Sequence, residues 1–121
     1  MFINCLAVGA GGFIGSILRY LVGSVIPSDM FPWGTLTINV VGSFALALIA
    51  GLVFRGAIDN ESVSLMLRVG LCGGFTTMST FSLEVVNLAT RDAWLAALGY
   101  AMLTCALCVA AAYAGGILAK G

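Results

Sequence analysis

The stretch GGFTTMSTFS, residues 73–82, decides how this chain folds. Two glycines and five hydroxyl residues crowd into ten positions that lie inside an otherwise apolar segment. Both kinds of residue weaken a helix, because glycine frees the backbone and Ser or Thr side chains compete for its hydrogen-bonding groups. The stretch therefore predicts a helix that is interrupted within an apolar run.

The composition around this stretch is typical of an integral membrane protein. Of the 121 residues, 61% are hydrophobic and 8% are charged, and the mean hydropathy is +1.13. Charged residues make up about a quarter of a soluble domain, and a membrane-crossing helix needs roughly 20 apolar residues. We expect one all-α membrane domain, 1–121, with four spans at about residues 2–26, 33–54, 63–89 and 93–118. The connections between them are too short to hold a soluble enzyme.

A break inside a bilayer has a restricted meaning. It is tolerated only where it is buried in protein or lines a water-filled cavity, and broken helices near the midplane commonly hold ions. We interpret the break in the third span as an ion site near the membrane midplane. A kinked helix that packs through glycine is the alternative.

The positive charges predict an undecided orientation. Arg55 and Lys120, with Arg68 just inside the third span, belong to the side of the two termini, whereas Arg91 and Arg19 belong to the opposite side. An excess of Lys and Arg on the cytoplasmic side normally orients a membrane protein. The near balance favours insertion in both directions and an antiparallel dimer, and an orientation set by one or two flanking charges is the alternative.

In the first span, small residues and one arginine share a helix face. Gly15, Arg19 and Gly23 are spaced four apart, with Gly11 one step earlier. Small residues at this spacing allow helices to approach closely. Arg19 is either a functional group on the packed face or an anchor that reaches the interface.

The second and fourth spans also contain polar side chains at helical spacing. Asn39 lies deep enough to need hydrogen-bond partners, and its amide either joins two helices or donates to an anion. Tyr100, Thr104 and Cys108 follow one another at intervals of four and predict a ladder of neutral donors along one face. The chain has no histidine, and its four cysteines favour packing over a metal site or a disulfide framework.

Three motifs together resemble the Fluc/CrcB fluoride channels. They are GLCGGFTTMSTFSLE at 70–84, GTLTINVVGSF at 34–44 and GGFIGSILRY at 11–20, and the resemblance extends over the whole chain. It implies a passive, fluoride-selective channel in the inner (plasma) membrane that exports cytoplasmic fluoride and so confers fluoride resistance. It also implies a dual-topology antiparallel homodimer with two pores and a structural sodium ion at the dimer axis. The expected partners are fluoride, the lipid bilayer and a second copy, with no nucleic acid.

The resemblance also implies roles for individual residues. Backbone carbonyls of Gly73 and Thr76 would hold the sodium ion, and Arg19 would lie in the vestibule. The residues implied along the fluoride pathway are Asn39, Met78, Ser79, Thr80, Phe81, Glu84, Tyr100, Thr104 and Cys108.

One position departs from the family pattern. The family usually has F-S-T-F where this chain has Met78-Ser79-Thr80-Phe81. The rim of an aromatic ring is its positive part, so Phe81 is expected to offer a ring edge to fluoride, whereas Met78 keeps the size and loses that edge.

Three other functions remain open at this point, and one of them is a non-conducting subunit of a membrane assembly. The departure at Met78 is compatible with a half-channel that needs a paralogous partner. Small multidrug-resistance transporters have the same size and span number, but they rely on a carboxylate in the first span, and residues 2–26 contain none.

Overall fold

The computed structural model describes residues 1–121, and every regular element is a helix. The elements are α1 (Phe2–Val25), α2 (Trp33–Phe54), α3 (Glu61–Leu65), the π-helix η1 (Met66–Cys72), α4 (Gly73–Phe75), α5 (Met78–Thr90) and α6 (Trp94–Lys120). Four helical segments are long and apolar enough to cross a membrane, namely Phe2–Val25, Trp33–Phe54, Glu61–Thr90 and Trp94–Lys120. The expectation of an all-α, multi-pass membrane protein with four spans is confirmed.

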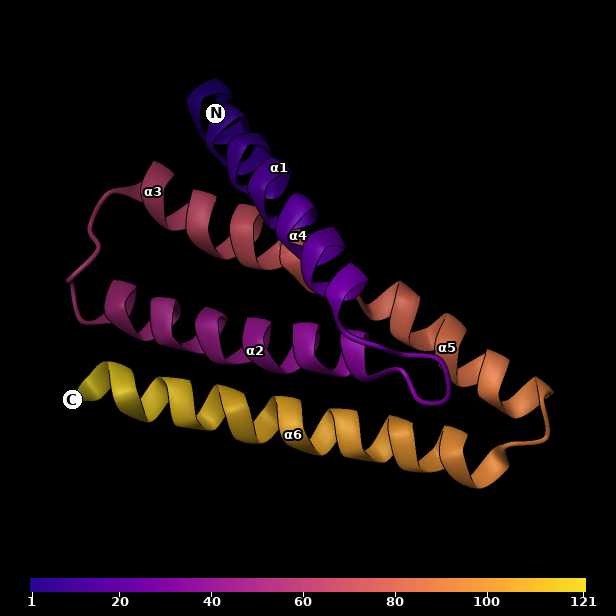
Figure 1. The fold of residues 1–121 in the computed structure, drawn as a ribbon. Helices are drawn as coiled ribbons and strands as arrows, with labels where there is room; N and C mark the ends of the chain where they lie inside the picture. Colours follow the sequence, from indigo (N-terminus) through magenta and orange to yellow (C-terminus); the bar gives the residue numbers. More distant parts are fainter.

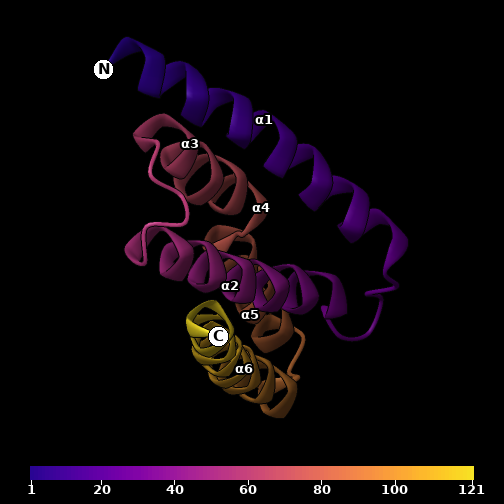
Figure 2. The same ribbon diagram turned by 90° about the vertical axis from the view of Figure 1, so that its left-hand side faces the viewer.

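The helices form a bundle in which both termini lie at the same end (Figure 1). Helix α1 packs on η1 and α4, while α2 packs on α6, which also contacts α5. Figure 2 shows α2 between α6 and the segment from α3 to α4. Large apolar side chains, such as Phe13, Phe54, Leu83 and Leu95, are exposed on all four spans, as suits a surface that faces lipid.

Small residues bring α1 against the third span. A Cβ added at Gly15 would collide with the carbonyl oxygen of Leu71, and one added at Gly70 would lie 2.6 Å from the carbonyl oxygen of Val8. Gly11 and Gly15 are buried. The predicted close packing through Gly11 and Gly15 is therefore confirmed, and the two helices touch backbone to backbone.

The third span changes its helical geometry twice. Met66–Cys72 is a π-helix, whose wider turn no feature of the sequence predicted. Between α4 and α5, Thr76 (φ −84°, ψ 159°) and Thr77 (φ −152°, ψ 111°) are extended.

The two glycines of the stretch 73–82 are themselves helical. Gly73 has φ −64° and ψ −37°, and the interruption falls at Thr76 and Thr77. Gly74 packs tightly on α1, because an added Cβ would lie 2.9 Å from the carbonyl oxygen of Gly12. Close approach, rather than helix breaking, accounts for glycine at position 74.

Candidate functional site

Asn39 of α2 holds the extended segment of the third span. Its Nδ2 donates to the carbonyl oxygen of Thr77 at 3.0 Å, and its Oδ1 accepts from the N–H of Thr77 at 2.8 Å. The side-chain amide thus pairs with both polar groups of one residue in the break. Asn39 is 9% exposed, so this pairing satisfies backbone groups that water reaches poorly.

The interruption of the helix also leaves two carbonyl groups without their usual donors. In a continuous α-helix the N–H groups of Thr77 and Thr80 would donate to the carbonyls of Gly73 and Thr76. Here the N–H of Thr77 donates to Asn39, and the N–H of Thr80 donates to the Oγ1 of Thr77 at 3.2 Å. The carbonyls of Gly73 and Thr76 are therefore without their helical donors.

Arg19 of α1 lies against this break. Its Nε donates to the carbonyl oxygen of Gly74 at 3.0 Å, which supplies a partner to another carbonyl in the last turn before the break. The side chain is half-buried. Arg19 thus stabilises the end of α4 and is not a free interfacial anchor.

Asn39 also lines a cavity of about 260 Å³. This central cavity is lined by Asn39, Gly42, Ser43, Leu46, Thr76, Thr77, Met78, Phe81, Thr104, Cys105 and Cys108. Thr104 is 4% exposed, and its hydroxyl has no hydrogen-bond partner within the chain. A buried hydroxyl normally has a partner, and this one, on a residue that lines the cavity, has none within the chain.

Glu84 of α5 is held by two hydroxyl groups. Its Oε2 accepts from the Oγ1 of Thr35 at 3.0 Å, and its Oε1 accepts from the hydroxyl of Tyr100 at 2.9 Å. Tyr100 is 0% exposed, and its ring packs against that of Phe81 with 5.2 Å between the two ring centroids. These contacts connect the aromatic wall of the central cavity to the carboxylate.

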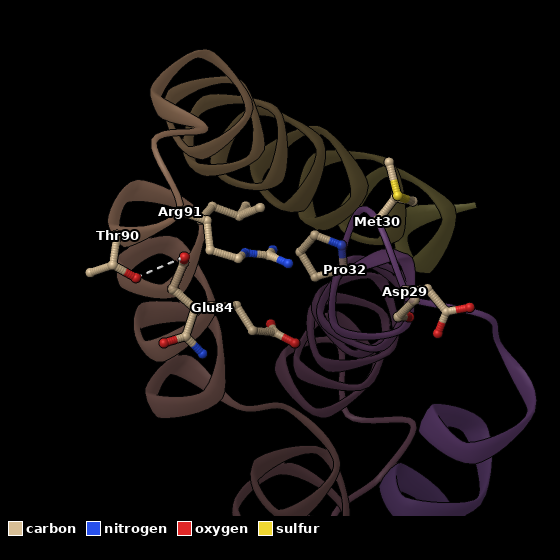
Figure 3. Close-up of a pocket in the computed structure, with 9 residues that line it drawn as sticks. Asp29, Met30, Pro32, Glu84, Thr90 and Arg91 are labelled. Carbon is tan, nitrogen blue, oxygen red and sulfur yellow. Dashed lines mark hydrogen bonds between the residues drawn. The ribbon is translucent and has the colours of Figure 1, made fainter.

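Glu84 lines two further cavities, each of which contains one arginine. The Arg19 cavity, about 380 Å³, is lined by Arg19, Tyr20, Gly23, Ser24, Ser28, Gly34, Thr35, Ile38, Thr77, Thr80 and Glu84. The Arg91 cavity, about 400 Å³, is lined by Ser28, Asp29, Met30, Pro32, Glu84, Asn87, Leu88, Thr90 and Arg91. Figure 3 shows this second cavity.

The structure brings most of the expected pathway residues together, in two groups. Asn39, Met78, Phe81, Thr104 and Cys108 share the central cavity. Glu84 and Tyr100 are bonded to each other beside it.

Two hydroxyl residues expected on the pathway lie outside the central cavity. Thr80 lines the Arg19 cavity, where its hydroxyl accepts from the Oγ1 of Thr77 at 3.0 Å. Ser79 is exposed and lines none of the three cavities.

The sequence interpretation assigned no site role to two residues that the site uses. Thr35 binds Glu84, and it lies four positions before Asn39 on the same helix face. Thr77 is the N-cap of α5 and the partner of Asn39. A threonine just before a resumed helical pattern was the available signal for such a cap.

Comparison with known proteins places the chain in a family. The family described as "CrcB-like protein, Camphor Resistance (CrcB)" matches residues 6–116. The fluoride-specific ion channel FluC of Ruminiclostridium cellulolyticum is 40% identical over 121 positions, which cover 98% of this chain and 93% of that protein. FluC of Phenylobacterium zucineum is 43% identical over 119 positions (95% and 94%), and FluC 1 of Nitrobacter hamburgensis is 45% identical over 113 (91% and 90%). A match of this length, together with such relatives, shows that the chain belongs to the CrcB family.

Proposed function

We propose that this protein is a passive, fluoride-selective channel that exports cytoplasmic fluoride from the cell and so confers fluoride resistance. Its relatives are named fluoride-specific ion channels. The observation that carries the proposal is the unpartnered hydroxyl of Thr104 in a cavity that contains no charged side chain. Such a cavity suits a small anion that needs hydrogen bonds and must also leave.

Fluoride is small and strongly hydrated, so a pore has to replace several water hydrogen bonds at once. The central cavity offers the hydroxyl of Thr104 and the second N–H of Asn39, since only one of its two amide hydrogens is used by Thr77. A fixed positive charge in the cavity would hold the anion too strongly for conduction. Neutral donors substitute for water without trapping the ion.

Phe81 supplies the apolar part of this environment. Its ring is buried in the wall of the central cavity, and the positive rim of an aromatic ring attracts an anion at a dry position. Beyond Phe81, the hydroxyl of Tyr100 and the carboxylate of Glu84 are the next polar groups along the proposed pathway. Arg19 is the one cation of the next cavity, where it attracts anions toward the pathway.

Flow through such a pathway is passive, and its direction follows the electrochemical gradient. Neutral hydrogen fluoride crosses membranes from acidic surroundings and dissociates in the more neutral cytoplasm. The anion that accumulates there leaves through the channel in the inner membrane. No step requires a proton carrier or an energy source.

We further propose that two antiparallel copies form the channel, with two pores and a structural sodium ion on the twofold axis. The carbonyls of Gly73 and Thr76 fit a sodium ion, because both lack their helical donors and a hard cation prefers oxygen. One chain offers these two oxygens, and a second copy would double them. When bound, the ion would supply positive charge that offsets repulsion between anions in the two pores.

The experiment is passive fluoride efflux from liposomes. Purified protein is reconstituted with internal potassium fluoride or potassium chloride, and valinomycin starts the flow. The proposal predicts rapid fluoride release without chloride release. Equal release of both anions, or none from a well-folded protein, would contradict it.

A half-channel that needs a paralogous partner is the second candidate, and Met78 favours it. This side chain stands where the family pattern usually has a phenylalanine, and it is 71% exposed. A partner chain would then supply the missing ring. Co-purification of a second CrcB subunit, with fluoride flux only from the mixed protein, would support this candidate over the homodimer.

A further inference from the structure

The Arg91 cavity is lined mainly by polar and charged residues, as suits the mouth of an ion pathway. The connection between α1 and α2 forms one wall, and the last turns of α5 form the other. Seven of its nine lining residues are not hydrophobic. Figure 3 shows the side chain of Arg91 reaching across the cavity toward Pro32, on the same side as the carboxylate of Glu84, while the carboxylate of Asp29 points away.

Two side chains in this cavity keep free N–H donors. The guanidinium of Arg91 and the amide of Asn87 make no side-chain hydrogen bond, and only their backbone groups are engaged. The hydroxyls are already used, because Ser28 donates to the carbonyl of Ile26 at 3.3 Å and Thr90 donates to that of Asn87 at 3.0 Å. Arg91 and Asn87 are thus the groups left to receive an anion.

Glu84 explains why a cation is needed there. An anion that approaches this carboxylate from either cavity is repelled, and each cavity contains one arginine that offsets part of that repulsion. The Arg91 cavity also has a second carboxylate, that of Asp29, in its lining, and this group points away from Arg91 in Figure 3. Arg19 already donates to the carbonyl of Gly74, whereas Arg91 is exposed and unengaged. Arg19 therefore also braces the break, whereas the whole guanidinium of Arg91 is available to ions.

We propose that Arg91, assisted by the amide of Asn87, forms an anion-attracting site for small hydrated halides at this mouth of the pathway. This inference rests on the proposed channel function. Arg91 raises the local concentration of fluoride and so sets how fast ions reach Glu84 and Tyr100. Such an effect is electrostatic, and salt screens it.

The test is fluoride flux in liposomes at constant fluoride and varied concentrations of an impermeant potassium salt. Arg91→Gln should lower flux by about tenfold near 0.01 M total salt, within the range known for electrostatic steering. The difference should largely disappear near 1 M, where the screening length falls to about 3 Å. Arg91→Lys should behave as the wild type.

A matched control removes a charge elsewhere. Lys120 is exposed at the opposite end of the bundle and lines none of the three cavities. Lys120→Gln should leave the salt dependence unchanged. An equal loss of low-salt flux in Lys120→Gln and Arg91→Gln would overturn the inference. Flux would then depend on the total charge of the protein and not on a charge in the Arg91 cavity.

A second variant keeps the inference testable if Arg91→Gln does not fold. Asn87→Asp leaves the arginine in place and adds a negative charge to the same cavity, so it should also lower flux at low salt and recover at high salt. Unchanged low-salt flux in either variant would contradict the proposed site. A wild-type protein that releases no fluoride at all would instead refute the channel function itself.

Discussion

Asn39→Ala should weaken the fold and the fluoride flux together. The mutation removes the two hydrogen bonds, at 3.0 and 2.8 Å, that pair the amide with the backbone of Thr77. A side-chain hydrogen bond between membrane helices is worth about 0.6 to 1.7 kcal/mol. Two such bonds amount to about 1 to 3 kcal/mol, or roughly a 5- to 150-fold change in the folding equilibrium.

The assay is equilibrium unfolding in mixed micelles, followed by circular dichroism, alongside fluoride efflux from liposomes. Ser43→Ala is the matched control, because Ser43 lines the same cavity from the same helix and donates no hydrogen bond to the break. It should change the unfolding free energy by less than about 0.5 kcal/mol. If Asn39→Ala slows fluoride but unfolds like the wild type, the amide serves only the ion, and the reasoning from the break is wrong.

The remaining predictions concern the pathway, the packing and the topology. Phe81→Ile should abolish fluoride flux while size-exclusion chromatography still shows a dimer, because the ring edge is lost; undiminished flux would remove that role. Met78→Phe should preserve or raise flux, because the side chain is 71% exposed and a ring restores the family pattern; a blocked pore would argue against Met78 in the lining. Gly15→Ala should lower the unfolding free energy by about 1 to 3 kcal/mol, since its methyl group collides with the carbonyl of Leu71. Gly9→Ala, whose methyl group would meet open space, should not lower the unfolding free energy. Equal effects of the two substitutions would contradict the close packing at Gly15. A tag on the C terminus should be reached from both sides of the membrane, and one-sided labelling would exclude dual topology.

The sequence predicted the spans closely, because hydropathy and helix length are local properties. The four expected spans differ from the observed helical segments by no more than two residues at any end. Gly11 and Gly15 were also predictable as packing residues, since their spacing places them on one helix face. These features depend on residues that are near one another in the chain.

The details of the break depended on contacts between distant residues. The stretch 73–82 was expected to interrupt the helix, and within it Gly73 and Gly74 are helical while Thr76 and Thr77 are extended. The position of the interruption follows from the amide of Asn39, which pairs with Thr77 across 38 positions of sequence. No local pattern contains that partnership.

The candidate site was predictable as a set of residues but not as an arrangement. Asn39, Phe81 and Thr104 line one cavity as a pathway requires. The hydrogen bond from Arg19 to the carbonyl of Gly74 joins residues 55 positions apart, and no local sequence pattern predicted this contact. The role proposed for the free guanidinium of Arg91 could not be predicted from the sequence either, because it depends on the cavity around that side chain.

The most direct test of fluoride selectivity is the reversal potential of the purified protein in a planar bilayer. One side holds potassium fluoride and the other holds a tenfold lower fluoride concentration, with chloride replacing the difference. A fluoride-selective channel should reverse at the fluoride equilibrium potential, about 59 mV for this gradient. Reversal at about 0 mV, as expected for a pore that passes potassium or that passes fluoride and chloride equally, would contradict it.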